Sequence, residues 1–123
     1  MGKGKIPETA LKLAQDAARR IRSLEAEASR ALAEGDTATH RQELTQKCLV
    51  LEALAGEAIG SLGAGRTAET AAFVAGLEDF AQRAGMALSL ESIFFMGALL
   101  YPDDYQDGDP NDLERFLDRF EAA

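Results

Sequence analysis

The chain has a single histidine, His40, which stands three residues before Glu43. On a helix this spacing places an imidazole and a carboxylate on one face, as the metal ligands of di-iron bundles are placed. Such a centre takes a second histidine-bearing helix, and the sequence has no second histidine. Haem ligation would need Met86 or Met96 opposite His40, and nothing in the sequence fixes either methionine there. We therefore predict a solvated histidine on a helix surface, and no metal or haem cofactor.

The acidic stretch of residues 103–114 is the better candidate for binding a metal. Counted as a calcium loop, it matches the expected positions 1, 5, 6, 9 and 12 with Asp103, Asp107, Gly108, Asn111 and Glu114. Tyr105 supplies no carboxylate at position 3, and Pro110 lacks the N–H group needed at position 8. The alternative is a capping loop in which Asp109 caps a helix that Pro110 opens, with Asp112 and Glu114 in the first turn. We predict the capping loop, and a calcium-binding regulatory bundle remains the alternative function.

The other chemistry-bearing residues stand alone. Cys48 is the single cysteine and falls between Leu44 and Leu51 at helical spacing, so we predict a buried, inert thiol. Residues 80–94 imitate a helix-turn-helix, but residues 90–94 offer no Arg, Lys, Asn or Gln to reach base edges. The sequence contains no phosphate-binding glycine loop, no Ser-His-Asp set and no cluster of carboxylates at fixed spacing on one helix face. We therefore predict that the protein is not an enzyme.

Length and composition indicate one folded domain spanning residues 1–123, of which 46% are hydrophobic and 28% charged. Residues 1–62 hold nine Lys/Arg and nine Asp/Glu, whereas residues 63–123 hold four and twelve, which accounts for the net charge of -8. An acidic half of this kind repels nucleic acid. The longest apolar run, residues 93–101, is far shorter than the about 20 residues that span a bilayer, and no secretory pattern precedes it. We expect a cytoplasmic protein that binds neither nucleic acid nor membrane.

Apolar periodicity near 3.6 predicts an all-α helical bundle. Residues 7–34 and 36–62 read as two long helices, and Gly35-Asp36 is a connection short enough to impose an antiparallel hairpin. Three shorter helices should follow: one from Thr67 to Gly85, one from Ser89 to Pro102 that is apolar on nearly all sides, and one opened by Asp109-Pro110. Residues 1–6 should form a flexible N-terminus, and residues 102–109 an acidic loop before the terminal helix.

The expected core follows the apolar stripes of these helices. In the hairpin the stripes are Ala10, Ala14, Ala17, Ile21, Leu24, Ala28 and Ala31, then Leu44, Cys48, Leu51, Ala55, Ala58 and Leu62. In the shorter helices they are Phe73, Leu77, Phe80 and Ala84, then Leu113, Phe116, Leu117 and Phe120. An all-apolar helix is either central or shared with a partner. Either the terminal helix or a second polypeptide should close the remaining face of the 89–102 helix, and we expect the terminal helix to do so.

Three segments resemble the flagellar export chaperones of the flagellin-binding kind: residues 31–36, 40–54 and 63–70. The likeness extends over residues 7–85 or thereabouts. It implies a small cytoplasmic helical bundle that holds the disordered C-terminal part of a flagellin and keeps it from polymerising before export. Where that family carries a tyrosine-aspartate-glycine run, this chain has Ala14-Gln-Asp-Ala17, and no tyrosine precedes Tyr101.

These observations favour a non-enzymatic protein–protein interaction module, an adaptor or an export-chaperone-like bundle. Small-residue seams and the apolar 89–102 segment supply surfaces of the kind that helix-in-groove recognition uses. The expected partner is another protein or a second copy of the chain in a homodimer.

Overall fold

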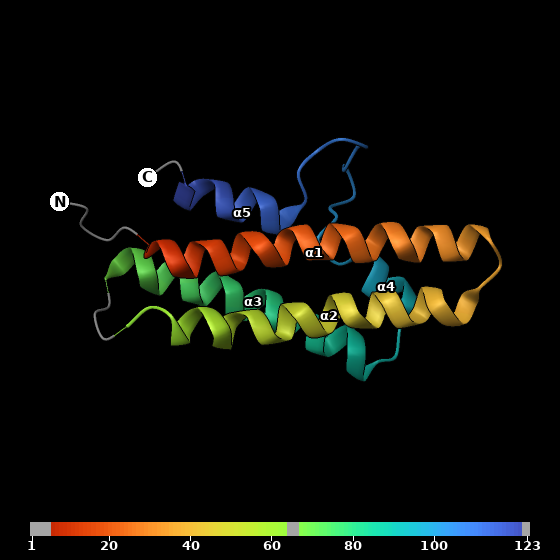
Figure 1. Cartoon of the computed structure of the whole chain (residues 1–123), viewed down its shortest axis with the longest axis horizontal. Helices are drawn as coiled ribbons and strands as arrows, with labels where there is room; N and C mark the ends of the chain where they lie inside the picture. Colours follow the sequence, from red (N-terminus) through yellow and green to blue (C-terminus); the bar gives the residue numbers. More distant parts are fainter. Residues whose placement is uncertain (1–5, 64–66, 122–123) are drawn as a thin grey trace.

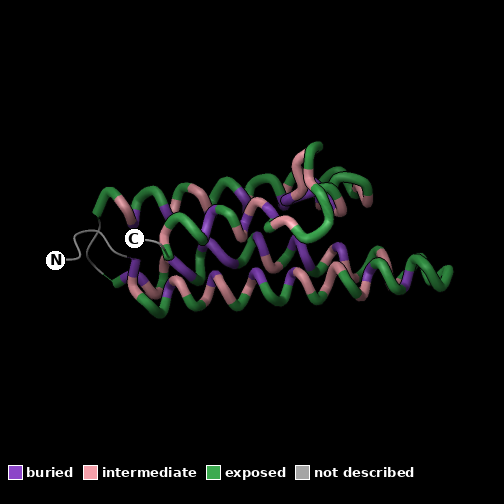
Figure 2. The backbone as a smooth tube through the Cα atoms, turned by 90° about the horizontal axis from the view of Figure 1, so that it is seen from above, coloured by how far each residue is buried: buried purple, intermediate pink, exposed green. Residues whose placement is uncertain are grey.

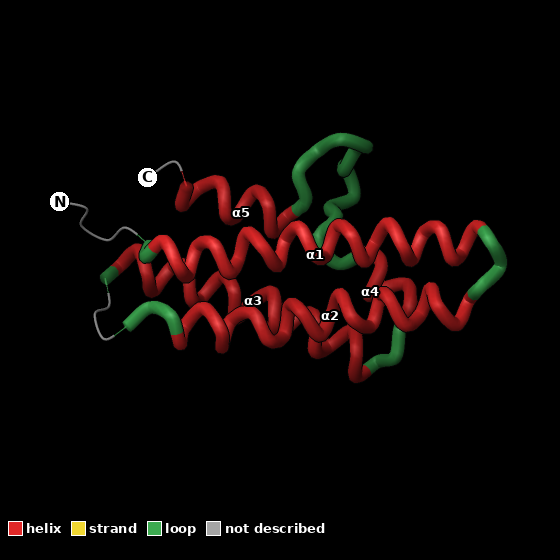
Figure 3. Tube along the Cα trace, viewed as in Figure 1, coloured by secondary structure: helices red, strands yellow, loops and turns green. Residues whose placement is uncertain are grey.

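The computed structural model describes residues 6–63 and 67–121, which form five α-helices and no strand (Figures 1 and 3). The helices are α1 (Glu8–Ala33), α2 (Thr37–Gly60), α3 (Ala68–Ser89), α4 (Ile93–Ala98) and α5 (Asp112–Glu121). The predicted all-α fold class is confirmed. Among the described helices, none has the length and apolarity to cross a membrane.

The helix contacts close into a ring. α1 packs on α2, α2 on α3, α3 on α5, and α5 on α1, while α4 contacts α2 and α3. α5 covers only the N-terminal half of α1, and the tip of the α1–α2 hairpin extends beyond the other helices (Figures 1 and 2). The result is a four-helix arrangement whose fourth member is short, so the far half of the hairpin is less covered.

The predicted hairpin turn is confirmed. Gly35 adopts φ +81°, a conformation that favours glycine, and the Asp36 N–H donates to the Ala31 carbonyl at 2.9 Å. The Asp36 carboxylate then accepts from the Thr39 N–H at 3.0 Å and caps α2. At the other end of α1, Pro7 stands in the cap position rather than in the first turn.

The core lies along an alanine-rich seam. The buried residues of α1 are Ala10, Ala14, Ala18, Ile21, Ala28 and Ala31. Ala17 and Leu24, which were expected in the seam, are only half-buried. Ala18, which is buried in place of Ala17, lines a groove between α1 and α5 together with Leu117. A seam that faces α2 alone does not include this second partner.

α3 corrects the expected third helix. Thr67 caps it as predicted, in a capping box with Thr70, and the expected stripe of Phe73, Leu77, Phe80 and Ala84 is buried. The helix does not stop at Gly85, however, but continues to Ser89. One glycine inside a helix costs only about 1 kcal/mol, and burial of Ala84 and Ala87 on either side of it offsets that cost.

α4 is shorter and more exposed than expected. Ser92, not Ser89, caps it by accepting from the Phe95 N–H at 3.1 Å, and the helix ends at Ala98, well before Pro102. Glu91 and Leu100 have φ of 51° and 81°, so the backbone turns at both ends of the apolar run. Within α4 only Met96 is buried. The interpretation of this segment as a central helix was wrong, and the alternative, a helix shared with a partner, stays a prediction.

α5 also departs from its expected start and position. Asn111 rather than Asp109 caps it: Asn111 accepts from the Glu114 N–H at 2.9 Å, and Glu114 accepts from the Asn111 N–H at 2.8 Å. Phe116 and Phe120 pack on Phe73 of α3, with ring centroids 6.1 and 5.2 Å away. α5 therefore closes the groove between α1 and α3 and leaves α4 uncovered, contrary to expectation.

The expected flexible N-terminus, residues 1–6, lies outside the described residues except for Ile6. Ile6 is buried in the core cluster. The run Gly63-Ala64-Gly65 predicts a flexible break after the second helix. Residues 64–66 lie outside the described ranges, and Gly63, which is described, has φ +77°.

Two glycines of α3 test how tightly α5 is packed. A methyl group at Gly76 would overlap the Phe116 ring, which Phe80 and Phe120 enclose. We expect Gly76→Ala to lower the free energy of unfolding by about 1–3 kcal/mol, because overpacking outweighs the gain in helix propensity. Urea denaturation followed by circular dichroism measures the change.

Gly85→Ala is the matched control. Its methyl group would meet only the carboxylate oxygen of the exposed Glu52, at 2.7 Å, and that side chain can rotate away. We expect this variant to be more stable than wild type by up to about 1 kcal/mol. A Gly76→Ala protein as stable as Gly85→Ala would show that α5 is not packed against α3 as described.

Candidate interaction surface

Four large apolar side chains lie exposed where α3 meets α4. Phe94 is 75% exposed, Met86 60%, Leu90 58% and Phe95 51%. The rings of Phe94 and Phe95 contact each other, with centroids 5.6 Å apart. Single exposed apolar residues are ordinary, but a contiguous group of this size marks an interaction site on many proteins. We call these four residues the α4 surface.

Two grooves flank the α4 surface. The smaller, of about 300 Å³, lies between α3 and α4 and is lined by Arg83, Met86, Ala87, Leu90, Phe95, Ala98 and Leu99. We call it the α3–α4 groove. Phe95 lines this groove, and Phe94 does not.

The larger groove, of about 740 Å³, follows the part of the α1–α2 hairpin that α5 does not cover. We call it the hairpin groove. Its apolar lining comes from Ala26 and Ala28 of α1, Leu44 of α2, and Ile93, Phe94, Gly97 and Ala98 of α4. Its polar lining comes from Arg22, Glu25, Ser29, His40, Tyr101, Tyr105 and Asp107.

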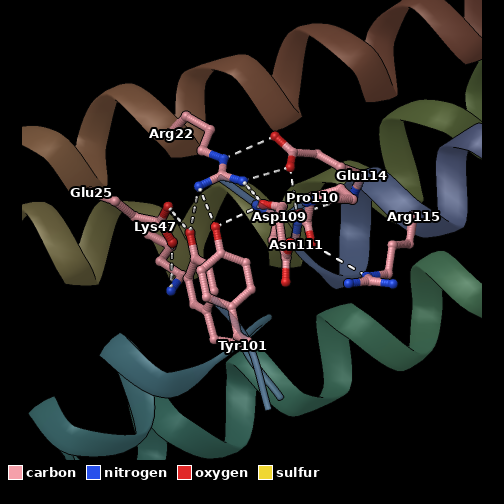
Figure 4. Close-up of polar contacts among 10 residues, drawn as sticks. Arg22, Glu25, Lys47, Tyr101, Asp109, Pro110, Asn111, Glu114 and Arg115 are labelled. Carbon is pink, nitrogen blue, oxygen red and sulfur yellow. Dashed lines mark hydrogen bonds and ion pairs between the residues drawn. The ribbon is translucent and has the colours of Figure 1, made fainter. Parts of the chain in front are cut away.

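A buried lysine holds α4 beside this groove. Lys47 of α2 is 0% exposed. Its ammonium forms an ion pair with Glu25 Oε2 at 2.9 Å (Figure 4). It also donates to the carbonyls of Leu99 at 2.8 Å and Gly97 at 3.3 Å. The ring of Tyr101 lies 5.2 Å away, close enough for a cation–π interaction. Burial lowers the pKa of Lys47, and the charge of Glu25 opposes this effect.

Tyr101 links the lysine site to a second cation. Its hydroxyl donates to Glu25 Oε1 and accepts from Arg22 Nη1 at 3.3 Å (Figure 4). Burial raises the pKa of Tyr101, and the neighbouring Glu25 raises it further. The phenol therefore remains a neutral hydrogen-bond donor under ordinary conditions.

Arg22 of α1 fastens the loop between α4 and α5. It donates to both carboxylate oxygens of Glu114, at 2.9 and 2.7 Å, and to the carbonyl of Asp109 at 3.0 Å (Figure 4). Tyr105 supplies a further acceptor for Arg22 and donates its own hydroxyl to the Asp109 carbonyl at 2.7 Å. The hydrogen bonds from Arg22 lower the pKa of Glu114. This two-point pairing fixes the start of α5 against α1.

The backbone at Leu100 is strained where these two sites meet. Leu100 is 1% exposed and has φ +81°, a region that residues other than glycine rarely occupy. Its carbonyl accepts from the Asp112 N–H at 2.9 Å, while Lys47 holds the preceding carbonyl of Leu99. Strain of this kind persists only where surrounding contacts impose it.

The structure places two of the residues singled out in the sequence, His40 and Asp107, in the lining of the hairpin groove, which does not include Cys48. His40 lies on the surface of α2, but it is half-buried and its Nδ1 lies 2.8 Å from the Ala28 carbonyl of α1, so the predicted surface histidine is only partly solvated. The connection between antiparallel helices brings the two groups together, which helical periodicity alone does not show. Cys48 is buried as predicted, and burial raises the pKa of its thiol.

The calcium interpretation of residues 103–114 meets competing contacts. Glu114, the residue at position 12, is held by Arg22, and Asn111 is a helix cap. Within the two described ranges, no three His, Cys, Asp or Glu side chains form a group that could hold a metal ion.

Lys47 was missed at the level of sequence. It lies three residues after Leu44 and four before Leu51, which places it on the buried stripe of α2. The charge of its side chain favoured a solvated position. Helical spacing was therefore the available signal.

No protein-family model matches this chain, and no curated protein or solved structure does so either. The function is therefore inferred from its own geometry.

The Arg22–Glu114 pair makes a pH-dependent contribution to stability. Folding lowers the pKa of Glu114 from its ordinary value of 4.5. The stabilisation is therefore fully present above about pH 4.5 and is lost as the pH falls through the lower folded-state value. We expect Glu114→Gln to lower the free energy of unfolding at neutral pH by about 1–2 kcal/mol, with a deficit relative to wild type that shrinks in acid.

Denaturation curves at a series of pH values measure this deficit. Glu78→Gln, which removes an exposed carboxylate of α3 that forms no ion pair among the described residues, is the control and should cost little. A deficit for Glu114→Gln that stays constant from neutral to acid pH would contradict the assigned role of the pair.

Proposed function

We propose that this chain is a non-enzymatic protein-binding bundle that takes an apolar helical segment of a partner protein into the hairpin groove. The observation that carries the proposal is the position of Phe94, a large aromatic side chain that is 75% exposed and lines the hairpin groove. Burying one such side chain on binding contributes about 2 kcal/mol or more. Aromatic anchors beside a groove are the usual core of helix-in-groove interfaces.

The groove is prepared for binding before any partner arrives. α4 is fixed at its C-terminal end because Lys47 binds the carbonyls of Gly97 and Leu99. Its N-terminal end is fixed by the Ser92 cap. A surface held in one geometry loses less conformational entropy on binding than a mobile one. The backbone that carries Phe94 is therefore held in place before a partner binds.

The ionisable groups of the groove favour binding over catalysis. Lys47 is paired with Glu25, and Arg22 is paired with Glu114. These four groups are held by structural partners, and Asp107, the other carboxylate that lines the groove, forms no ion pair among the described residues. The groove thus offers no paired base and nucleophile of the kind that hydrolases use. We therefore propose a binding function without a catalytic step.

The resemblance of residues 7–85 to flagellar export chaperones supports placing this chain among cytoplasmic adaptors or chaperones. The hairpin belongs to that stretch, and the hairpin groove opens along it. In this role the bundle would hold an aggregation-prone segment of a partner, or of a second copy of itself, and cover that segment's apolar face.

The proposal predicts binding of a synthetic amphipathic peptide of about 18 residues, five helical turns, with a leucine face and glutamines elsewhere. Phe94→Ser should weaken binding about tenfold or more, which corresponds to losing about 1.4 kcal/mol of apolar contact. Fluorescence anisotropy of the labelled peptide gives the dissociation constants, and circular dichroism verifies that the variant is folded.

Phe95→Ser is the matched control, since Phe95 is in the same helical turn but lines the α3–α4 groove. It should change the affinity less than twofold. The proposal fails if wild-type protein does not bind the peptide, or if Phe94→Ser binds it as tightly as wild type does.

A further inference from the structure

We infer that the hairpin groove selects a segment that carries lysine or arginine beside its apolar face. This inference rests on the proposed function, and it specifies the chemistry of the partner. It depends on how the charges around the groove are distributed after the internal pairs have formed.

The two cations at the groove are neutralised within the chain. The Arg22 guanidinium binds both oxygens of the Glu114 carboxylate, and the Lys47 ammonium lies 2.9 Å from Glu25 Oε2. Both pairs are at least partly shielded from solvent, because the Lys47 side chain is fully buried and that of Glu114 is 28% exposed. Neither cation is therefore free to form an ion pair with an incoming ligand.

The acidic residues of the neighbouring loop are not neutralised. Asp103, Asp104 and Asp107 are exposed, and no ion pair of the described residues includes them. Asp107 itself lines the hairpin groove. Arg115, the nearby cation of α5, donates to the Pro110 carbonyl and is not part of the groove lining. The unbalanced charge at this edge of the groove is therefore negative.

The apolar and acidic parts of the hairpin groove come from different elements. Leu44, Ile93 and Phe94 supply apolar lining from α2 and α4, and the loop between α4 and α5 supplies Asp107. An amphipathic helix with its apolar face against α4 would bring one flank to the loop. A basic flank would be attracted there, and an acidic flank repelled, over the roughly 8 Å range of unscreened charge.

Three peptides with one common leucine face test the inference. They carry lysine, glutamine or glutamate at the flanking positions. Wild-type protein should bind the lysine peptide about fivefold more tightly than the glutamine peptide, and the glutamate peptide more weakly than both. Added salt should reduce the difference between the peptides, because screening weakens only the charge contribution.

The triple variant Asp103→Asn, Asp104→Asn, Asp107→Asn should bind the lysine and glutamine peptides within twofold of each other. A control with the same change in net charge, Glu57→Gln, Glu78→Gln, Glu121→Gln, alters exposed positions outside the groove and should keep the fivefold preference. Phe94→Ser should weaken binding of the lysine peptide as much as it weakens binding of the glutamine peptide. Equal losses would place both peptides in one groove.

Equal affinity of wild type for all three peptides would overturn the inference while leaving the proposed function standing. An equal loss of preference in the two triple variants would also overturn it, because the preference would then follow net charge. Absence of binding by every peptide would overturn the proposed function itself.

Discussion

The buried ammonium of Lys47 constrains how the second half of the chain joins the first. A charged group inside a protein costs several kcal/mol unless partners surround it. Here the partners come from three places: Glu25 on α1, the last carbonyls of α4, and the ring of Tyr101 after α4. Satisfying one side chain of α2 therefore determines where α4 ends. It also leaves Phe94, on the same short helix, exposed beside the hairpin groove.

Arg22, which lies one turn before Glu25 on α1, imposes a similar constraint. Its guanidinium binds Glu114 at the start of α5 and the Asp109 carbonyl in the preceding loop, so the loop must return to α1 before α5 begins. The two cations meet at Tyr101, which hydrogen-bonds to Arg22 and to Glu25. Lys47 and Arg22 pair with Glu25 and Glu114. Asp103, Asp104 and Asp107 of the loop form no ion pair among the described residues. The proposed binding surface and its negative edge thus lie beside the same two ion pairs.

The hairpin was predictable because its determinants are local. Gly35 and Asp36 end one helix and cap the next, and the apolar period runs unbroken on both sides. The cap of α5 was also readable, since Glu114 follows Asn111 at the spacing of a capping box. Asp109-Pro110 offered a competing start two residues earlier, and only the contact of the Asp109 carbonyl with Arg22 shows that this segment belongs to the loop.

The candidate surface was not predictable in the same way. Residues 90–101 read as one apolar helix, but positive φ at Glu91 and Leu100 divides the run, and neither residue type signals such a turn. The pairing of Lys47 with Glu25 joins different helices, and no local pattern connects them. Periodicity placed Lys47 on the buried stripe, while its charge argued for solvent. The tertiary partners decided between the two.

The central claim is that the Lys47 ammonium holds α4 and the following loop on the hairpin. Amide hydrogen exchange in Lys47→Met tests it most directly, with Leu51→Ala, a fully buried neighbour on α2, as the control. We predict that the substitution accelerates exchange of residues 93–112 at least ten times more than it accelerates exchange of α1 and α2. The reason is that local opening no longer has to break the lysine contacts. Leu51→Ala should accelerate all helices together. Uniform acceleration in Lys47→Met, or unchanged exchange in residues 93–112, would contradict the claim.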